Sequence, residues 1–194
     1  MDSPLDTVDW PVRTERLSLR RVQDGDVEAT WTFRRLDEVS RWITMAPQDL
    51  ESYRAMFTEE ERLAKTLVVE LDGVVVGDLM LAVEDAWAQS EVREQARGTQ
   101  AELGWTIDPM YGGKGLATEA VIALVDLSFG PLGLRRVVAN CFADNEASWR
   151  LMERIGMRRE AHTVRESLHR DLGWIDGLSY ALLADEWAAR RHAS

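Results

Sequence analysis

The hydrophobic and polar positions of the chain follow two different periods. Residues 16–22 alternate apolar and polar side chains, which predicts a half-buried first strand. After residue 116 the apolar positions recur at three- and four-residue spacing, which predicts an amphipathic helix that ends at Gly130 and Pro131. The face of this helix consists of Ala117, Ala120, Val121, Leu124, Val125 and Ser128.

The same patterns predict the remaining elements. Asp72 and Gly73 form the strongest hairpin signal in the chain, between two apolar runs. Residues 84–100 are polar and poorly periodic, which predicts a long loop with at most a helical turn. The further expected helices cover residues 27–35, 50–64 and 149–155, and residues 24–26 offer a cap for the first of them. The further expected strands cover residues 66–71, 74–83, 101–107, 135–142, 157–165 and 177–183. The last two strands are expected to form a hairpin across a loop at residues 171–176.

The order of these elements indicates an α/β fold with a mixed sheet of about seven strands in a single layer and helices on both faces. Strands 101–107 and 135–142 are joined through a helix, so they are expected to be parallel with a right-handed crossover. Residues 1–13 show no periodicity and are expected to form a loosely held arm. Residues 14–194 are expected to form one domain.

A glycine-rich loop separates a predicted strand from the start of the long helix. Gly112, Gly113 and Gly115 let the backbone turn tightly, and the following helix offers unpaired N–H groups to an anion. The alternative is that the loop is only a tight turn that binds no ligand. The loop lacks the Ser or Thr that follows the lysine of a nucleotide P-loop, and it has Thr118 where a dinucleotide fingerprint has its third glycine.

Composition limits the classes of function. The formal net charge of -11 argues against a nucleic-acid surface and mildly favours a cationic acceptor. No apolar run is long enough to span a membrane, and the acidic start of the chain is unlike a signal peptide, so a cytoplasmic protein is expected. The single Cys141 excludes an internal disulfide and a multi-cysteine metal site, and its place in an apolar strand indicates packing.

Three motifs resemble those of the GNAT N-acetyltransferase superfamily. Gly115 and Ala117 fit the acyl-CoA loop pattern of Gln or Arg, two residues, Gly, one residue, Gly or Ala, and Gly112 stands where Gln or Arg is usual. Together with Glu102-Leu103-Gly104-Trp105 and Asn145-Glu146-Ala147-Ser148, this loop is similar to the RimJ/RimL branch, which includes ribosomal-protein N-terminal acetyltransferases. The resemblance runs from Thr14 to about Trp174.

The resemblance implies a GNAT fold in which the fourth and fifth predicted strands splay apart around the pantetheine arm of acetyl-CoA. It implies acetyl-CoA as cosubstrate and no metal. The cofactor-binding residues that it implies are Trp105, Thr106, Ile107, Gly112, Gly113, Lys114, Gly115, Leu116, Ala117, Thr118, Asn140, Asn145 and Ser148. Lys114 is expected to be solvated rather than essential, because backbone amides already serve the phosphates.

The resemblance also assigns chemistry to two side chains. Glu102 is the leading candidate for the general base, acting through water, and its alternative role is a strand-end carboxylate in solvent or an ion pair. Ser148 is the candidate acid beside the sulfur, and its alternative role is helix capping. Asn145 is either a pantetheine contact or an ordinary cap. His162 and His169 are possible bases on residue type alone.

The acceptor side is expected to use Trp31, Trp42 and Glu166. Tyr53 and Phe57 belong to the same aromatic group, for which packing in the core is the alternative. Glu166 ranks below Glu102 as a base.

The expected activity is acetyl-CoA-dependent transfer of an acetyl group to a primary amine by direct attack in a ternary complex. The acceptor is either a protein N-terminal α-amine or a small cationic amine such as an aminoglycoside. The alternative is a non-catalytic acyl-CoA binder or sensor. A homodimer is expected, with the loop around Trp87 and the C-terminal helix around Trp187 as contact surfaces.

Overall fold

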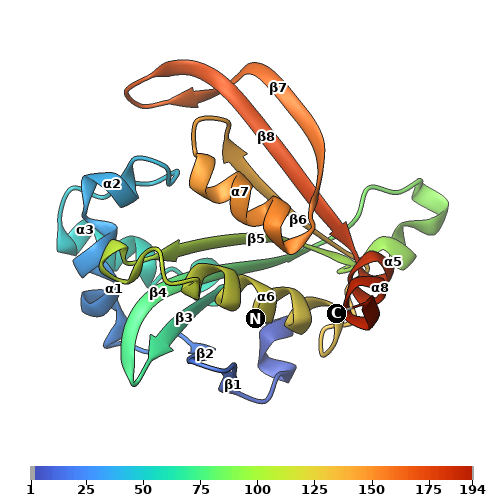
Figure 1. Ribbon diagram of the computed structural model, residues 1–194, viewed down its shortest axis with the longest axis horizontal. Coiled ribbons are helices and arrows are strands. Elements are labelled where there is room, and N and C mark those ends of the chain that lie inside the picture. The colour runs from blue at the N-terminus through green and yellow to red at the C-terminus, as the bar shows by residue number, and fades with distance from the viewer. Residues whose placement is uncertain (1–2, 194) are drawn as a thin grey trace. The chain divides into compact units, whose positions relative to one another are not determined.

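The computed structural model describes residues 3–193. Eight strands form a mixed sheet in the order β1-β2-β3-β4-β5-β6-β8-β7 (Figure 1). This confirms the expected α/β class, with one strand more than the seven that the pattern indicated. The extra strand is β1 (Val12–Arg13), which pairs antiparallel with β2 (Leu17–Arg21).

The chain packs into two compact units. The first holds the residues up to Ala82 together with Gly104–Leu127, and the second holds Val83–Leu103 together with the residues from Ser128 onward. Strand β5 (Gln100–Ile107) contributes its first four residues to the second unit and the rest to the first.

In the first unit, two helices supply an aromatic core beside the sheet. Val27 of α1 (Asp26–Arg34) and Tyr53, Met56 and Phe57 of α3 (Leu50–Phe57) form one buried cluster. Strands β3 (Thr66–Leu71) and β4 (Val74–Glu84) pair antiparallel across the expected turn, where Asp72 and Gly73 have positive φ.

The expected helix over 50–64 is broken, and this expectation is wrong. Helix α3 ends at Phe57, and α4 (Glu60–Leu63) begins two residues after Thr58. Glu59, Glu60 and Glu61 explain the break, because carboxylates oppose the negative end of a continuing helix and favour the positive end of a new one. A short helix, α2 (Asp37–Ser40), was not predicted.

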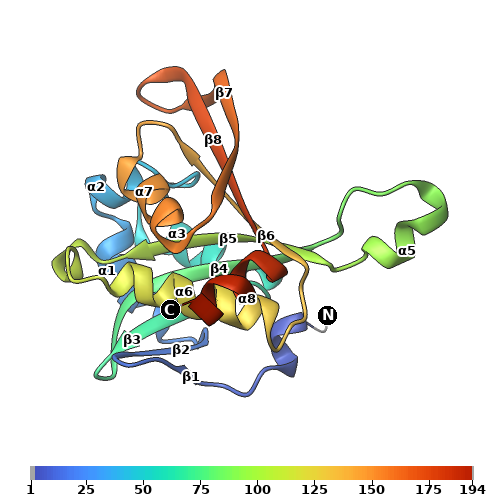
Figure 2. The same ribbon diagram turned by 45° about the vertical axis from the view of Figure 1, so that its right-hand side comes forward.

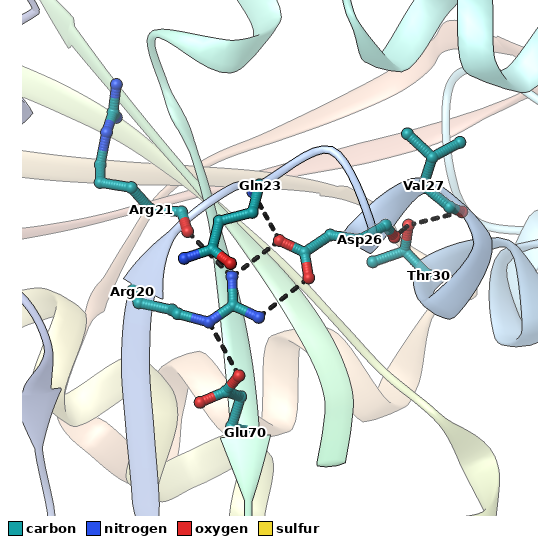
Figure 3. Close-up of polar contacts among 7 residues, drawn as sticks. All are labelled: Arg20, Arg21, Gln23, Asp26, Val27, Thr30 and Glu70. Atoms are coloured by element: carbon teal, nitrogen blue, oxygen red, sulfur yellow. Dashed lines mark hydrogen bonds and ion pairs between the residues drawn. The ribbon is translucent and has the colours of Figure 1, made fainter. Parts of the chain in front are cut away.

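Arg20 connects β2 with β3 and with the start of α1 (Figure 3). Its guanidinium donates to both oxygens of Asp26 at 2.7 and 2.9 Å and to Glu70 at 2.8 Å. Asp26 also accepts the backbone N–H of Gln23 at 2.6 Å. The Asp26 carboxylate therefore binds Arg20 and Gln23 and does not cap the helix, whose N-cap residue is Gly25.

The N-terminal segment is packed, which corrects the expectation of a loosely held arm. Leu5 is 1% exposed, in a short 3-10 helix (Pro4–Thr7) capped by Ser3. The Ser3 hydroxyl donates to the carbonyl of Ala64 at 2.5 Å, and the Trp10 indole donates to the carbonyl of Leu5 at 2.8 Å. No periodicity is visible in this segment because a single buried leucine in a short turn produces none. Met1 and Asp2 lie outside the described residues.

In the second unit, helix α7 lies against the strands β6, β8 and β7 (Figure 1). These elements cover Glu146–Ile155, Arg136–Phe142, Gly173–Leu183 and Arg158–His169 respectively. Strands β5 and β6 pair in parallel, as expected, and β6 pairs antiparallel with β8. The C-terminal helix is α8 (Ala184–Ala193), and α6 (Leu116–Phe129) has its last two residues in this unit.

The hairpin of β7 and β8 is longer than expected, and the predicted loop over 171–176 is wrong. The strands remain paired as far as His169 and Gly173. His169 is 3% exposed, and its Nδ1 accepts the N–H groups of Asp171 and Leu172 at 3.1 and 3.2 Å. This side chain closes the turn, so the polar residues that suggested a loop extend the hairpin instead.

The segment between β4 and β5 forms an arm that carries a 3-10 turn (Ser90–Val92) and α5 (Arg93–Ala96) (Figure 2). Trp87 on this arm is 96% exposed. Trp187 is 9% exposed and packs within its own chain, so this side chain is not available for a contact, and the surface of the C-terminal helix stays a prediction. None of the helices within residues 3–193 is long and apolar enough to cross a membrane.

Replacing Leu5 with Ala is expected to lower the free energy of unfolding by about 2–5 kcal/mol, because it leaves a cavity in a fully packed site. Val74→Ala is the matched control, since Val74 is 52% exposed and its truncation is expected to cost less than about 0.5 kcal/mol. Urea unfolding followed by circular dichroism measures both. Equal, small changes would show that the N-terminal segment adds nothing to the fold.

Candidate active site

The glycine loop leads directly into α6 in the first unit. Asp108 accepts the N–H of Met110 at 2.9 Å and so starts a short 3-10 turn, Pro109–Tyr111. Gly113 and Gly115 follow with φ of 71° and 78°. A Cβ on Gly115 would have no neighbour closer than 3.6 Å, so the left-handed backbone, and not lack of space, requires glycine there. The loop thus presents bare backbone at the N-terminus of a 14-residue helix, which fits a phosphate-bearing ligand.

Glu119 fixes the start of α6 to the residues before β2. Its carboxylate accepts the Thr14 hydroxyl at 2.5 Å, the Arg16 backbone N–H at 2.8 Å and Arg16 Nε at 2.6 Å. The same guanidinium donates to the carbonyl of Lys114 at 2.9 Å, inside the loop. Burial disfavours the charge, but the hydrogen bonds from Thr14 and Arg16 outweigh it and hold the pKa of Glu119 below its usual value. The sequence indicated only a helix-dipole partner at this position.

The other cofactor candidates of the first unit lie beside this loop in the chain. Thr106 is 8% exposed, and Trp105 and Ile107 are half-buried on β5. The N–H of Asp108 donates to the carbonyl of Val76 at 2.8 Å, which ties the end of β5 to β4. The ammonium of Lys114 lies 5.3 Å from the ring centre of Tyr111, with both residues at the surface of the loop. Gly112, Leu116, Ala117 and Thr118 complete the predicted set.

In the second unit, Glu102 lies in a row of side chains that crosses three strands. The Asn140 amide donates to Glu102 Oε1 at 3.0 Å, and the Ser179 hydroxyl donates to Asn140 Oδ1 at 2.7 Å. Asn140 faces Ser179 in the register of β6 and β8, and Glu102 faces Val138, two residues before Asn140. The three side chains therefore share one face of the sheet.

Ser148 lies on the other face of β6. Its hydroxyl hydrogen-bonds to the thiol of Cys141, which follows Asn140 directly and so points to the side covered by α7. Tyr180, opposite Ala139, reaches the same side and donates to Glu153 of α7 at 2.9 Å. Burial raises the pKa of Cys141 to about 11 despite the bond from Ser148, so the thiol stays neutral and fits a packing role.

Asn145 has the geometry of a helix cap. Its side-chain oxygen accepts the N–H of Ser148 at 3.3 Å at the start of α7. This is the alternative role that the sequence left open for Asn145. The Ser148 hydroxyl is directed to Cys141 and does not serve as the cap.

The aromatic candidates of the acceptor side divide into two groups. Tyr53 and Phe57 are 0% and 3% exposed, so they belong to the core, which is the alternative role given above for these aromatic side chains. Trp31 is half-buried with its ring 5.1 Å from that of Tyr53. Trp42 is half-buried, and the guanidinium of Arg41 lies 4.9 Å from its ring centre.

Glu166 lies in an irregular part of β7, where the register with β8 shifts between Thr163 and Ser167. Its Oε2 accepts the hydroxyls of Thr163 and Ser167 at 3.2 and 3.0 Å. A Cβ on Gly177 would come within 2.8 Å of both hydroxyls, so the bulge holds this carboxylate in a fitted position. The sequence offered no signal for the bulge.

Of the two histidines considered as bases, His162 is exposed and its Nε2 lies 2.7 Å from Asp176, while His169 is buried in the hairpin turn. His169 is thus wrong as a candidate base, because its Nδ1 already accepts backbone amides. Within residues 3–193 no group of three or more His, Cys, Asp or Glu side chains is placed to hold a metal ion.

The profile of the Acetyltransferase (GNAT) domain family matches residues 16–158. The chain belongs to this family. It is 29% identical over 177 residues to the N-acetyltransferase YnaD of Bacillus subtilis (strain 168), covering 91% of this chain and 98% of the relative. Over 89 residues, 46% of this chain and 45% of the relative, it is 30% identical to the [Ribosomal protein uS5]-alanine N-acetyltransferase of Escherichia coli (strain K12).

Solved GNAT structures agree with this assignment. A GNAT-family acetyltransferase from Bacillus anthracis matches with a TM-score of 0.76 at 30% identity, over 91% of this chain and 99% of that one. RimJ of Mycobacterium smegmatis, solved in complex with CoA-disulfide, matches with a TM-score of 0.71 at 26% identity, over 91% and 88%. The protein is therefore an N-acetyltransferase of the GNAT family with relatives in the RimJ/RimL branch, as its motifs indicated.

Glu119→Gln is expected to reduce stability at neutral pH, and the difference from wild type is expected to shrink in acid. A carboxylate whose pKa is lowered by folding stabilises the fold above its unfolded pKa of about 4.3, and this stabilisation is lost as the pH falls through the lowered folded value. Urea unfolding at a series of pH values measures the difference. Glu61→Gln is the control, because the Glu61 side chain is 90% exposed. A difference that is independent of pH would contradict the role given to the Glu119 charge.

Proposed function

We propose that this GNAT enzyme transfers the acetyl group of acetyl-CoA to a primary amine with cationic surroundings. A protein N-terminal α-amine is the favoured acceptor, and a small cationic amine such as an aminoglycoside is the second. The observation that carries the proposal is the arrangement around β6. The Glu102 carboxylate contacts Asn140 on one face of this strand, and the Ser148 hydroxyl contacts Cys141 on the other.

The loop at residues 112–117 supports the use of acetyl-CoA. Gly113 and Gly115 hold the backbone in the left-handed region just before the N-terminus of α6, so N–H groups are available for a pyrophosphate without side-chain charge. Arg16 holds this loop through the carbonyl of Lys114. RimJ of Mycobacterium smegmatis, a structural neighbour, was solved with CoA-disulfide.

Acetyl-CoA supplies the acyl group as an activated thioester, so the protein needs chiefly to position the amine and move protons. Glu102 accepts the proton that the attacking amine loses, directly or through water. Among the described residues, none donates a hydrogen bond to its Oε2, whereas Oε1 is held by Asn140. The hydroxyl of Ser148, on the other face, turns from Cys141 to donate a hydrogen bond to the departing sulfur as the carbon–sulfur bond breaks. Glu102 thus acts on the amine and Ser148 on the sulfur, from opposite faces of the sheet.

The acceptor is inferred from charge and from one relative. The net charge of -11 attracts cationic molecules. On the β7–β8 hairpin, Glu166 and Asp176 offer carboxylates, and a hydrogen bond from the Arg165 backbone, together with His162, holds the pKa of Asp176 below its usual value. The Escherichia coli relative acts on the alanine of ribosomal protein uS5, which favours a protein N-terminus.

Transfer is expected from acetyl-CoA to a basic peptide with a free N-terminal alanine, measured as free thiol and by the mass of the peptide. The same peptide with a blocked N-terminus separates α-amine from lysine acetylation, and an aminoglycoside tests the second acceptor class. Glu102→Gln is expected to lower kcat about a hundredfold without changing the acetyl-CoA Kd. A binder without chemistry would show no transfer to any amine, and Glu102→Gln would then change nothing.

Gly115→Ala is expected to weaken acetyl-CoA binding about tenfold, because alanine strains the left-handed backbone of the loop. Gly25→Ala is the matched control, since φ at Gly25 is -72° and its Cβ meets open space. Calorimetric titration of the folded proteins measures both. Unchanged binding by Gly115→Ala would remove the loop from the cofactor site.

A further inference from the structure

Ser179, Asn140 and Glu102 form a hydrogen-bond relay across β8, β6 and β5 in the second unit. The two bonds measure 2.7 and 3.0 Å, and the strand registers bring all three side chains to one face. Each residue comes from a different strand, so the relay forms only when the three strands pair in this register. Rigid strands position such groups more accurately than loops do.

The relay has a direction that is set by the charge at its end. A carboxylate accepts hydrogen bonds and cannot donate one, so the Asn140 amide must turn its NH₂ group to Glu102. This leaves the amide oxygen facing β8, where the Ser179 hydroxyl donates to it. Ser179 thereby stabilises the orientation of Asn140 that Glu102 requires.

Both polar ends of the Asn140 side chain are engaged within the protein. An amide NH₂ group has two hydrogens and its oxygen has two lone pairs, so each keeps one further hydrogen-bond site, and the cofactor contact of Asn140 stays a prediction. The two observed bonds favour a role that acts through Glu102.

We propose that Asn140, oriented by Ser179, is a positioning residue for the general base Glu102, and that its substitution affects turnover more than cofactor affinity. This inference rests on the proposed function, because it assigns a role within that reaction. Asn140 holds Oε1 and fixes the plane of the carboxylate, so that Oε2 points consistently to the incoming amine. The hydrogen bond from the Ser179 hydroxyl to the Asn140 oxygen maintains this geometry through each turnover.

The test compares turnover and binding in the full-length protein. Asn140→Ala is expected to lower kcat about tenfold, the value of one hydrogen bond to a charged group, while the acetyl-CoA Kd stays within about twofold. Ser179→Ala is expected to give a smaller loss of kcat, and Ser179→Thr, which keeps the hydroxyl, is expected to restore it. Ser18→Ala, at a half-buried serine on β2, is the matched control and is expected to be without effect.

A double substitution separates positioning from a general structural effect. On a Glu102→Gln background, Asn140→Ala is expected to cost less than about twofold in kcat, because there is no carboxylate left to orient. Losses that multiply would overturn the proposal, as would a raised acetyl-CoA Kd with kcat unchanged. Thermal melting shows whether each variant is folded. If Asn140→Ala does not fold, Ser179→Ala replaces it in the test, because it perturbs the relay and leaves Asn140 in place.

The two levels of the proposal fail differently. A wild-type protein that binds acetyl-CoA and acetylates no amine would overturn the proposed function, and the positioning role with it. An active wild-type protein in which Asn140 and Glu102 act independently would overturn the positioning role alone.

Discussion

The carboxylate of Glu119 is the contact on which the glycine loop depends. It lies in the first turn of α6, where a negative charge suits the helix dipole but would repel a phosphate. Arg16 resolves this conflict, because it neutralises Glu119 and at the same time holds the carbonyl of Lys114. The backbone N–H groups of the loop are thus left to face a ligand near a carboxylate that is already paired.

This arrangement allows an acidic protein to offer a local site to an anion. The chain carries a formal net charge of -11, so its far field favours cations. The loop relies on short-range backbone dipoles, which are effective only at contact distance. Attraction of a cation by the net charge and contact of an anion with the loop would therefore operate over different distances, and neither requires a basic surface.

Much of the fold was predictable from the sequence because its elements have clear periods and clear ends. The alternation of residues 16–22 located β2, Asp72 and Gly73 located a hairpin, and Gly156 marks the end of α7 with φ of 92°. The errors arose where one side chain outweighed the local pattern. Leu5 fixes a segment without periodicity, and His169 turns an apparent loop into a hairpin.

The candidate site was predictable only in part. Glycine type and spacing located the loop, because backbone conformation restricts which residue is allowed there. The partners of Glu102, Glu119 and Glu166 were not predictable, since they come from strands far apart in sequence or from a bulge that no local pattern encodes. Residue type showed that a carboxylate was present, and tertiary pairing determined what that carboxylate could do.

Asn140 and Cys141 are neighbours in the chain but belong to opposite faces of β6, one bonded to Glu102 and the other to Ser148. The two sides of the candidate site are therefore set by the alternation of side chains along a single strand. A substitution in β6 alters one side chain, whereas the insertion or deletion of one residue between positions 136 and 140 would exchange the faces of everything on one side of the change. A change in the length of this strand is consequently more disruptive than a change of one residue type.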